Sequence, residues 1–253
     1  MLEQLKKQSM KDVMIRLVIC AIIILILLGV TRSSLLKLIK GPQDFSSLSL
    51  EELPDAYVNG DINVIIDVFA EYYEENDDGT EEITKNYYVI PFGEDKYIGL
   101  NVSKGDFPLA NLICDETYEY LMGTRDDLTS KIQVTGTVNK MNEETYGYYL
   151  DWFEKSQFLE NSTTEAIEAA ALPYMLQVDY IGTLDSALIY TLLVCICLVL
   201  LYAIIILIKG VTGAYLSRVK KYIKHNDSNF SLERMEVDYL SSVPIESVRV
   251  GKT

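Results

Sequence analysis

Two long apolar stretches dominate the hydrophobic pattern, one near each end of the chain. Residues 187–208 read ALIYTLLVCICLVLLYAIIILI and contain no charged side chain. At a rise of about 1.5 Å per residue, a helix of this length covers the roughly 30 Å hydrocarbon core of a bilayer. A soluble helix has no need to be apolar on every face. We therefore expect residues 187–208 to form a membrane-spanning helix.

The other apolar stretch, residues 13–31, reads VMIRLVICAIIILILLGVT. Its one charged residue, Arg16, is near an end, where the side chain can reach the lipid headgroups. We expect a first membrane-spanning helix here. The alternative is a cleaved secretory signal peptide, because a basic start precedes the apolar run and small residues lie near Gly29 and Thr31. The poor cleavage site and the second span favour the helix.

Basic residues beside the two stretches predict how the chain is oriented. Those before the first stretch and after the second are Lys6, Lys7, Lys11, Arg16, Lys209, Arg218, Lys220, Lys221 and Lys224. The positive-inside rule then places residues 1–12 and 209–253 in the cytoplasm, and residues 32–186 outside the plasma membrane. Within the outer part, residues 32–56 are expected to form an interfacial collar and a linker.

The segment after the second stretch alternates apolar and basic residues. This pattern predicts an amphipathic juxtamembrane helix that lies on an anionic lipid surface. The expected contacts with that surface come from Arg218, Lys220, Lys221 and Lys224. The alternative interpretation is a plain stop-transfer flank. The lipid bilayer is a predicted partner under either interpretation.

Between the spans, alternation of apolar and polar residues predicts β-strands. The expected strands cover residues 62–72, 83–92, 96–102, 131–138 and 174–181. The first three, separated by turn-forming residues, should form an antiparallel meander. In the fourth, Gly136 indicates a bulge or a close approach of another backbone.

Capping residues and apolar stripes predict three helices in the same region. Asp106 is the expected N-cap of the first, and Gly123 is its expected stop signal. Asn142 should cap the second, whose apolar stripe consists of Tyr146, Tyr149, Leu150, Phe153 and Phe158. A capping box at residues 162–165 opens the third, an Ala-rich helix that Pro173 should end.

The predicted order of elements indicates an α+β domain over residues 57–183. It is consistent with a small, mostly antiparallel sheet or an OB-like barrel with two to three helices. An open α+β sandwich with helices on one face fits nearly as well. The predicted domain is strongly acidic, since residues 41–183 contain 29 Asp and Glu against 7 Lys and Arg. Such a charge repels phosphates and argues against binding of nucleic acid.

Candidate catalytic and metal-binding residues are few. The only histidine, His225, lies in the predicted cytoplasmic tail, which removes His-based catalysis and zinc ligation from the outer domain. An EF-hand loop centred on Gly79 would place Lys85 at its twelfth position, where a bidentate Glu is required, so a solvated hairpin tip is expected instead. Cys114 is most simply a core residue. We assign no catalytic, metal or cofactor residue and expect no cofactor.

Pairs of aromatic residues indicate a binding surface. Three pairs of adjacent tyrosines are expected to place one ring in the core and one on the surface, where Tyr is common at interfaces. These pairs are residues 72–73, 87–88 and 148–149. Trp152 is predicted to be either a core residue or part of an aromatic belt at the membrane.

The layout of two spans around an acidic domain with the segments YYVIPFGEDKYIGLNV and VTGTVNKM resembles a group of membrane proteins. These are uncharacterised proteins of Gram-positive bacteria that are classified only as domains of unknown function. The resemblance covers residues 57–158 and the spans, and it implies no activity and no site residues.

Three functions remain as hypotheses. The first is a non-enzymatic, membrane-anchored protein whose outer domain binds a protein or an envelope component. The second is an accessory subunit of a membrane transport or secretion complex, in which the spans are the interface. The third is an envelope hydrolase that uses carboxylates of the outer domain.

Overall fold

The computed structural model describes residues 2–76, 79–156, 158–159 and 163–212. The described residues form two compact units, the first from residues 2–28 and 194–212 and the second within residues 29–193. The tail residues expected at a lipid surface, Arg218, Lys220, Lys221 and Lys224, lie outside the described residues.

Helical segments make up the described part of the first unit. They belong to α1 (Leu2–Lys40) and α5 (Ser186–Val211), which pack together. At Gly210 an added Cβ atom would lie 3.1 Å from Cγ1 of Val13, so the helices approach closely there. The segments Met10–Lys40 and Ser186–Gly210 are long and apolar enough to cross a membrane, judged by length and composition alone.

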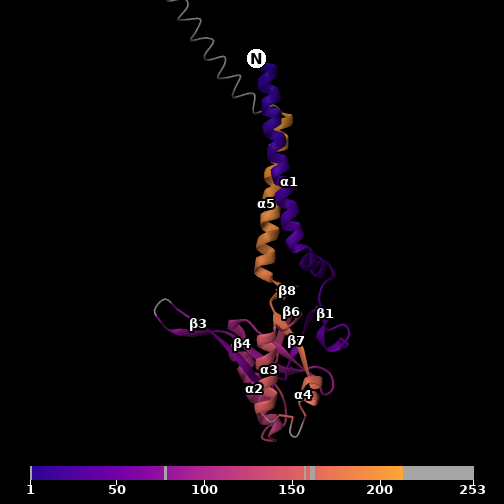
Figure 1. Ribbon diagram of the computed structural model, residues 1–253, viewed down its shortest axis with the longest axis vertical. Coiled ribbons are helices and arrows are strands. Elements are labelled where there is room, and N and C mark those ends of the chain that lie inside the picture. Colours follow the sequence, from indigo (N-terminus) through magenta and orange to yellow (C-terminus); the bar gives the residue numbers. More distant parts are fainter. Residues whose placement is uncertain (1, 77–78, 157, 160–162, 213–253) are drawn as a thin grey trace, which may run out of the picture. The chain divides into compact units, whose positions relative to one another are not determined.

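A seven-stranded mixed sheet forms the centre of the second unit (Figure 1). In spatial order its strands are β1 (Gln43–Asp44), β2 (Tyr57–Ile62), β6 (Ile132–Lys140), β7 (Ala171–Val178), β5 (Tyr97–Asn101), β4 (Glu81–Pro91) and β3 (Asp67–Glu75). The β1–β2 and β5–β7 pairs are parallel, and the other neighbours are antiparallel. A separate two-stranded ribbon contains β8 (Tyr180–Ile181) and β9 (Leu184–Asp185).

The α+β class and the meander β3–β4–β5 are confirmed, but the predicted barrel is wrong. Among the described residues, the edge strands β1 and β3 do not pair with each other, so the sheet stays open. Strand β7 lies between β5 and β6 and joins the two halves of the sheet. Most neighbouring strands are antiparallel, as expected, but the parallel pairs β1–β2 and β5–β7 make the sheet mixed, and with seven strands it is larger than expected.

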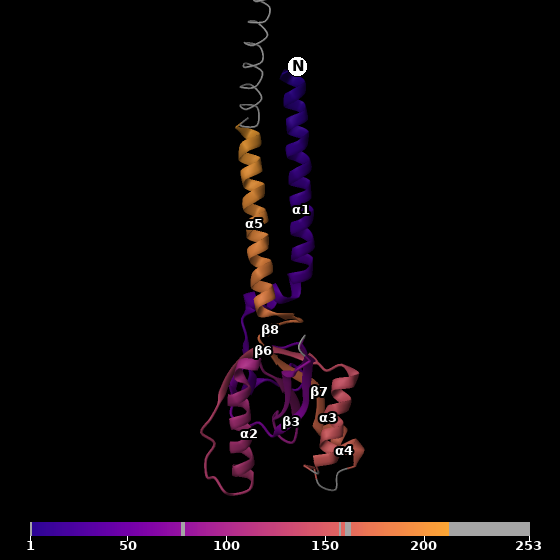
Figure 2. The same cartoon turned by 90° about the vertical axis from the view of Figure 1, so that its left-hand side faces the viewer.

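Helices cover both faces of the sheet, whereas the open alternative predicted helices on one face. One core lies under α2 (Phe107–Leu121), and the other lies under α3 (Glu143–Ser156) and α4 (Thr164–Ala170). Figure 2 shows α2 on one side of the strands and the α3–α4 pair on the other. Short 3₁₀ helices, η1 (Phe45–Ser47) and η2 (Lys104–Asp106), complete the unit.

One expected helix cap forms as predicted, and another forms one residue later than predicted. The side chain of Asn142 accepts a hydrogen bond from the backbone N–H of Thr145 at 2.7 Å. The N-cap of α4 is Thr163, which accepts from the N–H of Ala166, whereas the expected box starts at Ser162, outside the described residues. Asp106 occupies the expected N-cap position of α2. Its carboxylate instead accepts a hydrogen bond from the hydroxyl of Ser103 at 2.7 Å.

A polar cluster connects the end of α1 to the sheet within the second unit. The Ser34 hydroxyl donates to the carbonyl of Ile181 at 2.6 Å. The Thr137 hydroxyl donates to the carbonyl of Tyr180 at 3.0 Å and accepts from the N–H of Gly182 at 2.8 Å. Ser34 and Thr137 are fully buried. Removing either hydroxyl would therefore leave its hydrogen-bond partner without a bond in the interior, which is destabilising.

Gly136 shows the close backbone approach that its place in a strand indicates. It pairs with Val58 of β2 on one side and Val178 of β7 on the other, with no register shift at this point. An added Cβ atom would lie 2.1 Å from the carbonyl oxygen of Gln177. No real Cβ contact is that short, so β6 and β7 can pass each other here only with glycine.

The substitution Gly136→Ala should therefore force β6 and β7 apart. We expect it to lower the free energy of unfolding by about 3 kcal/mol or more. The measurement is thermal unfolding of the full-length protein in detergent, followed by circular dichroism. The control is Gly147→Ala in α3, where nothing lies within 4 Å of the added atom and helix propensity should rise. Equal melting temperatures for the two variants would contradict the account.

Candidate functional site

The edge of the sheet at β1 and β2 is open over part of its length. The two residues of β1 pair only with Val58 and Asn59 of β2, and the chain then turns into η1. Gly60 provides the space for this turn, because an added Cβ atom there would lie 3.0 Å from Cβ of Phe45. Beyond Asn59, no described strand pairs with β2 on this side.

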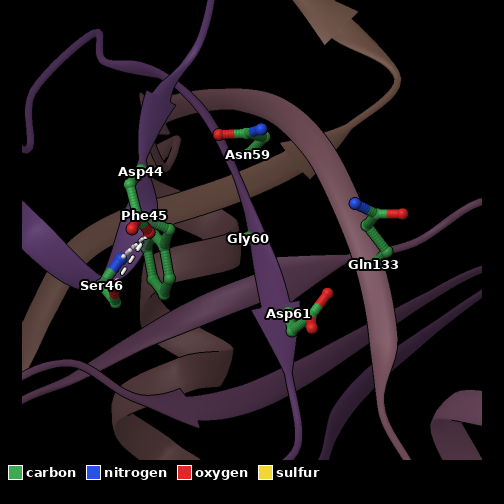
Figure 3. A pocket seen from close by; sticks show the side chains of 7 residues that line it. All are labelled: Asp44, Phe45, Ser46, Asn59, Gly60, Asp61 and Gln133. Atoms are coloured by element: carbon green, nitrogen blue, oxygen red, sulfur yellow. Dashed lines mark hydrogen bonds between the residues drawn. The ribbon is translucent and has the colours of Figure 1, made fainter.

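A polar cavity of about 510 Å³ lies at this open edge. Its lining consists of Asp44, Phe45, Ser46, Asn59, Gly60, Asp61 and Gln133. Figure 3 shows residues 44–46 on one side of β2 and Gln133 of β6 on the other. Segments nearly ninety positions apart in the sequence therefore build one site.

The polar side chains of this cavity differ in how far they are already engaged. Asp44 accepts hydrogen bonds from the backbone N–H and the hydroxyl of Ser46, at 3.0 and 2.9 Å. Asp61 forms an exposed ion pair with Lys131 at 2.5 Å. The side-chain amides of Asn59 and Gln133 form no hydrogen bond with any described residue, so both groups remain available to a ligand.

A second cavity of about 310 Å³ adjoins the first and shares Phe45, Ser46 and Asp61 with it. Its lining is more apolar and includes Leu48, Ile62, Val64, Ile90, Pro91 and Phe92. Ile62, Ile90 and Phe92 belong to the core under α2, whereas Asn59, Asp61 and Gln133 alternate with core residues and point the other way. The two cavities thus adjoin at the β2 edge, where the first offers mainly polar contacts and the second more apolar ones.

The tyrosine pairs follow the sequence prediction in part. Tyr149 is buried and Tyr148 is exposed, as expected, and Tyr88 is also buried. Tyr72 and Tyr73 are both exposed, so that prediction is wrong for this pair. Both lie in the outer part of β3, where residues 71–75 are all exposed, so neither ring reaches the core.

Trp152 and Cys114 lie in the described part of the second unit. The Trp152 ring packs at 4.9 Å from that of Phe153, and its indole N–H donates to Asp67 at 2.9 Å, so it is a core-edge residue. Cys114 packs against the core under α2, and burial raises the pKa of its thiol to about 11. That thiol stays protonated and unreactive at neutral pH.

The acidic turn at residues 74–82 lies at the end of the β3–β4 hairpin, and residues 77–78 of it are outside the described part. Among the described residues, no three His, Cys, Asp or Glu side chains gather closely enough to hold a metal ion. Sequence reasoning did not identify the β1–β2 cavities. Gly60 within a strand pattern was the available signal for a close approach.

Glu116 of α2 holds the loop that leads into β6. Its carboxylate accepts hydrogen bonds from the backbone N–H of Ser130 at 2.8 Å and of Thr129 at 3.1 Å, and from both hydroxyls. Arg125 adds an ion pair at 2.8 Å. The pKa of Glu116 falls to about 2, chiefly because its carboxylate accepts the hydrogen bond from the Ser130 N–H. Burial raises this pKa, and the other hydrogen bonds from Ser130 and Thr129 lower it further. This carboxylate is therefore structural and stays ionised.

The low pKa of Glu116 predicts a pH-dependent stability. Because the pKa of Glu116 is lower in the folded protein than in the unfolded chain, its ionised carboxylate stabilises the fold. This stabilisation is complete above the ordinary pKa of 4.5 and is lost as the pH falls towards 2. Glu116→Gln should lower the melting temperature by several degrees at pH 7, and the difference from the parent should shrink between pH 4.5 and 2. The exposed Glu154→Gln is the control and should change little. A pH-independent difference would contradict the assignment.

Comparison with known proteins identifies a family. Residues 2–209 match the family model described as Domain of unknown function (DUF8577). No curated protein and no solved structure matches the chain.

Proposed function

Because the chain belongs to this family of unknown function, we propose a role from its own structure: a non-enzymatic, membrane-anchored binding protein. The domain between the two helices binds a protein or an envelope component, and the helices hold that domain at the membrane. The resemblance to two-span proteins of Gram-positive bacteria supports a cell-envelope setting.

The membrane placement is supported by the composition of two helices. Met10–Lys40 and Ser186–Gly210 have the length and hydropathy of membrane spans. Large apolar side chains such as Leu25, Ile26 and Leu198 are more than half exposed, which is favourable in lipid and unfavourable in water. The basic flanks favour cytoplasmic termini, with residues 32–186 outside the plasma membrane.

The observation that carries the binding function is the pair of cavities at the open edge of β2. Binding sites are concave and combine apolar walls with a few polar groups that have no partner in the free protein. The side-chain amides of Asn59 and Gln133 are such unpartnered polar groups. Phe45 and its apolar neighbours provide the apolar walls.

The hydrolase alternative receives less support from the same structure. A general acid needs a carboxyl with a raised pKa in the cleft. Burial raises the pKa of Asp179, with contributions from Asp106 and Asp185, but Asp179 does not line either cavity. Glu116 has a lowered pKa and already uses both oxygens in the loop.

The proposed orientation predicts which positions an impermeant reagent can reach. In a Cys114→Ala background, Glu154→Cys should react with a membrane-impermeant maleimide on intact cells. Lys252→Cys should react only after the cells are permeabilised. Labelling of Lys252→Cys on intact cells, or protection of Glu154→Cys until permeabilisation, would overturn the orientation.

The proposed binding site predicts where a partner crosslinks. A photo-reactive amino acid at Gln133 in the full-length protein should give a discrete crosslinked product in native membranes under ultraviolet light. The same residue at the exposed position Glu154 on α3 is the matched control and should give none. A product of equal yield from both positions, or from Glu154 alone, would contradict a partner site at the β2 edge.

A further inference from the structure

The free edge of β2 presents backbone groups that a further strand could pair with. Alternate residues of a strand direct their N–H and C=O groups to the same side. Since β1 ends at Asp44, opposite Asn59, the outward-facing groups among residues 60–62 have no strand partner in the described chain. An edge of this kind is the usual acceptor for an extended peptide, which joins the sheet by main-chain hydrogen bonds.

The cavity on the polar side of this edge favours a basic side chain. Asp44 and Asp61 contribute carboxylates, and Asn59 and Gln133 contribute amide oxygens. The existing partner of Asp61, Lys131, forms an exposed ion pair, and such pairs contribute little stability. A lysine or arginine of a ligand can therefore share or replace it at small cost. The acidic domain as a whole attracts the same kind of ligand.

The adjoining cavity favours an apolar side chain, because Leu48, Ile62, Ile90 and Phe92 line it. Successive side chains of a strand point to opposite faces, so they meet different surroundings. A strand placed along residues 60–62 would lie beside both the polar acidic cavity and the apolar one. A segment that alternates basic and apolar residues fits both at once.

A second copy of the chain is a less suitable occupant. The other free edge of the sheet is β3, whose exposed outer half carries Glu71, Glu74 and Glu75. Pairing that edge with the β2 edge would bring these carboxylates towards Asp44 and Asp61. Like charges disfavour such a contact, and charges on an edge strand are a common protection against self-association.

On the premise of the proposed binding function, we propose that the β2 edge takes up an extended segment of a partner protein as an added strand. The segment alternates basic and apolar residues. Main-chain pairing to residues 60–62 supplies affinity, and the two cavities select the side chains.

The test uses full-length protein in lipid nanodiscs and three fluorescein-labelled peptides, with fluorescence anisotropy as the readout. The first is Thr-Val-Lys-Val-Lys-Val-Thr, the second replaces both Lys by Glu, and the third is the first with alternate amides N-methylated. We expect the first to bind, the second to show no binding, and N-methylation to weaken binding by about tenfold or more.

Variants of the cavity separate site binding from general attraction to an acidic domain. Gln133→Lys adds a positive charge without removing any hydrogen bond and should weaken binding about fivefold or more, whereas Gln133→Glu should strengthen it. Glu154→Lys, remote on α3, is the control and should leave the affinity within about twofold.

Three results would each overturn strand addition. They are binding of the N-methylated peptide as tight as that of the first peptide, equal effects of Gln133→Lys and Glu154→Lys, and no binding of the first peptide. The proposed binding function has a separate test. If crosslinking from Gln133 gives a partner while the peptides fail, the binding function stands and the added strand is wrong. If both fail, the binding site at β2 is wrong as well.

Discussion

The contact on which the second unit most depends is the approach of β6 and β7 at Gly136. A side chain there would meet the Gln177 carbonyl at 2.1 Å, so glycine permits β7 to lie directly against β6. Through β7, the β1–β2–β6 half of the sheet is joined to the β5–β4–β3 half. The resulting sheet is open, and β2 is unpaired on its outer side beyond Asn59.

Much of the local structure could be predicted because it depends on neighbours in the sequence. Asn142 and Thr163 cap their helices through residues three positions away. The predicted strand at residues 62–72 fails in its middle for a non-local reason. There the N–H of Ile65 bonds to the Thr117 hydroxyl, and the N–H of Ile66 bonds to the carbonyl of Val89, which ends one strand and starts the next.

The candidate site was harder to predict because its parts are distant in the sequence. Residues 44–46 fall in a segment that composition identifies as a linker, and Gln133 looks like an ordinary exposed strand residue. The parallel pairing of β1 with β2 and the antiparallel pairing of β2 with β6 bring them together. The barrel prediction failed for a similar reason, since hydrophobic alternation identifies strands but not their order across 70 or so residues.

The central claim is that residues 60–62 form a strand-accepting edge in a membrane-anchored protein. Hydrogen–deuterium exchange of the full-length protein in nanodiscs, with and without the lysine-containing peptide, examines it most directly. The account predicts slower amide exchange at residues 60–62, where edge N–H groups gain partners, and no change along β3. Unchanged exchange at residues 60–62 with protection along β3 would contradict it.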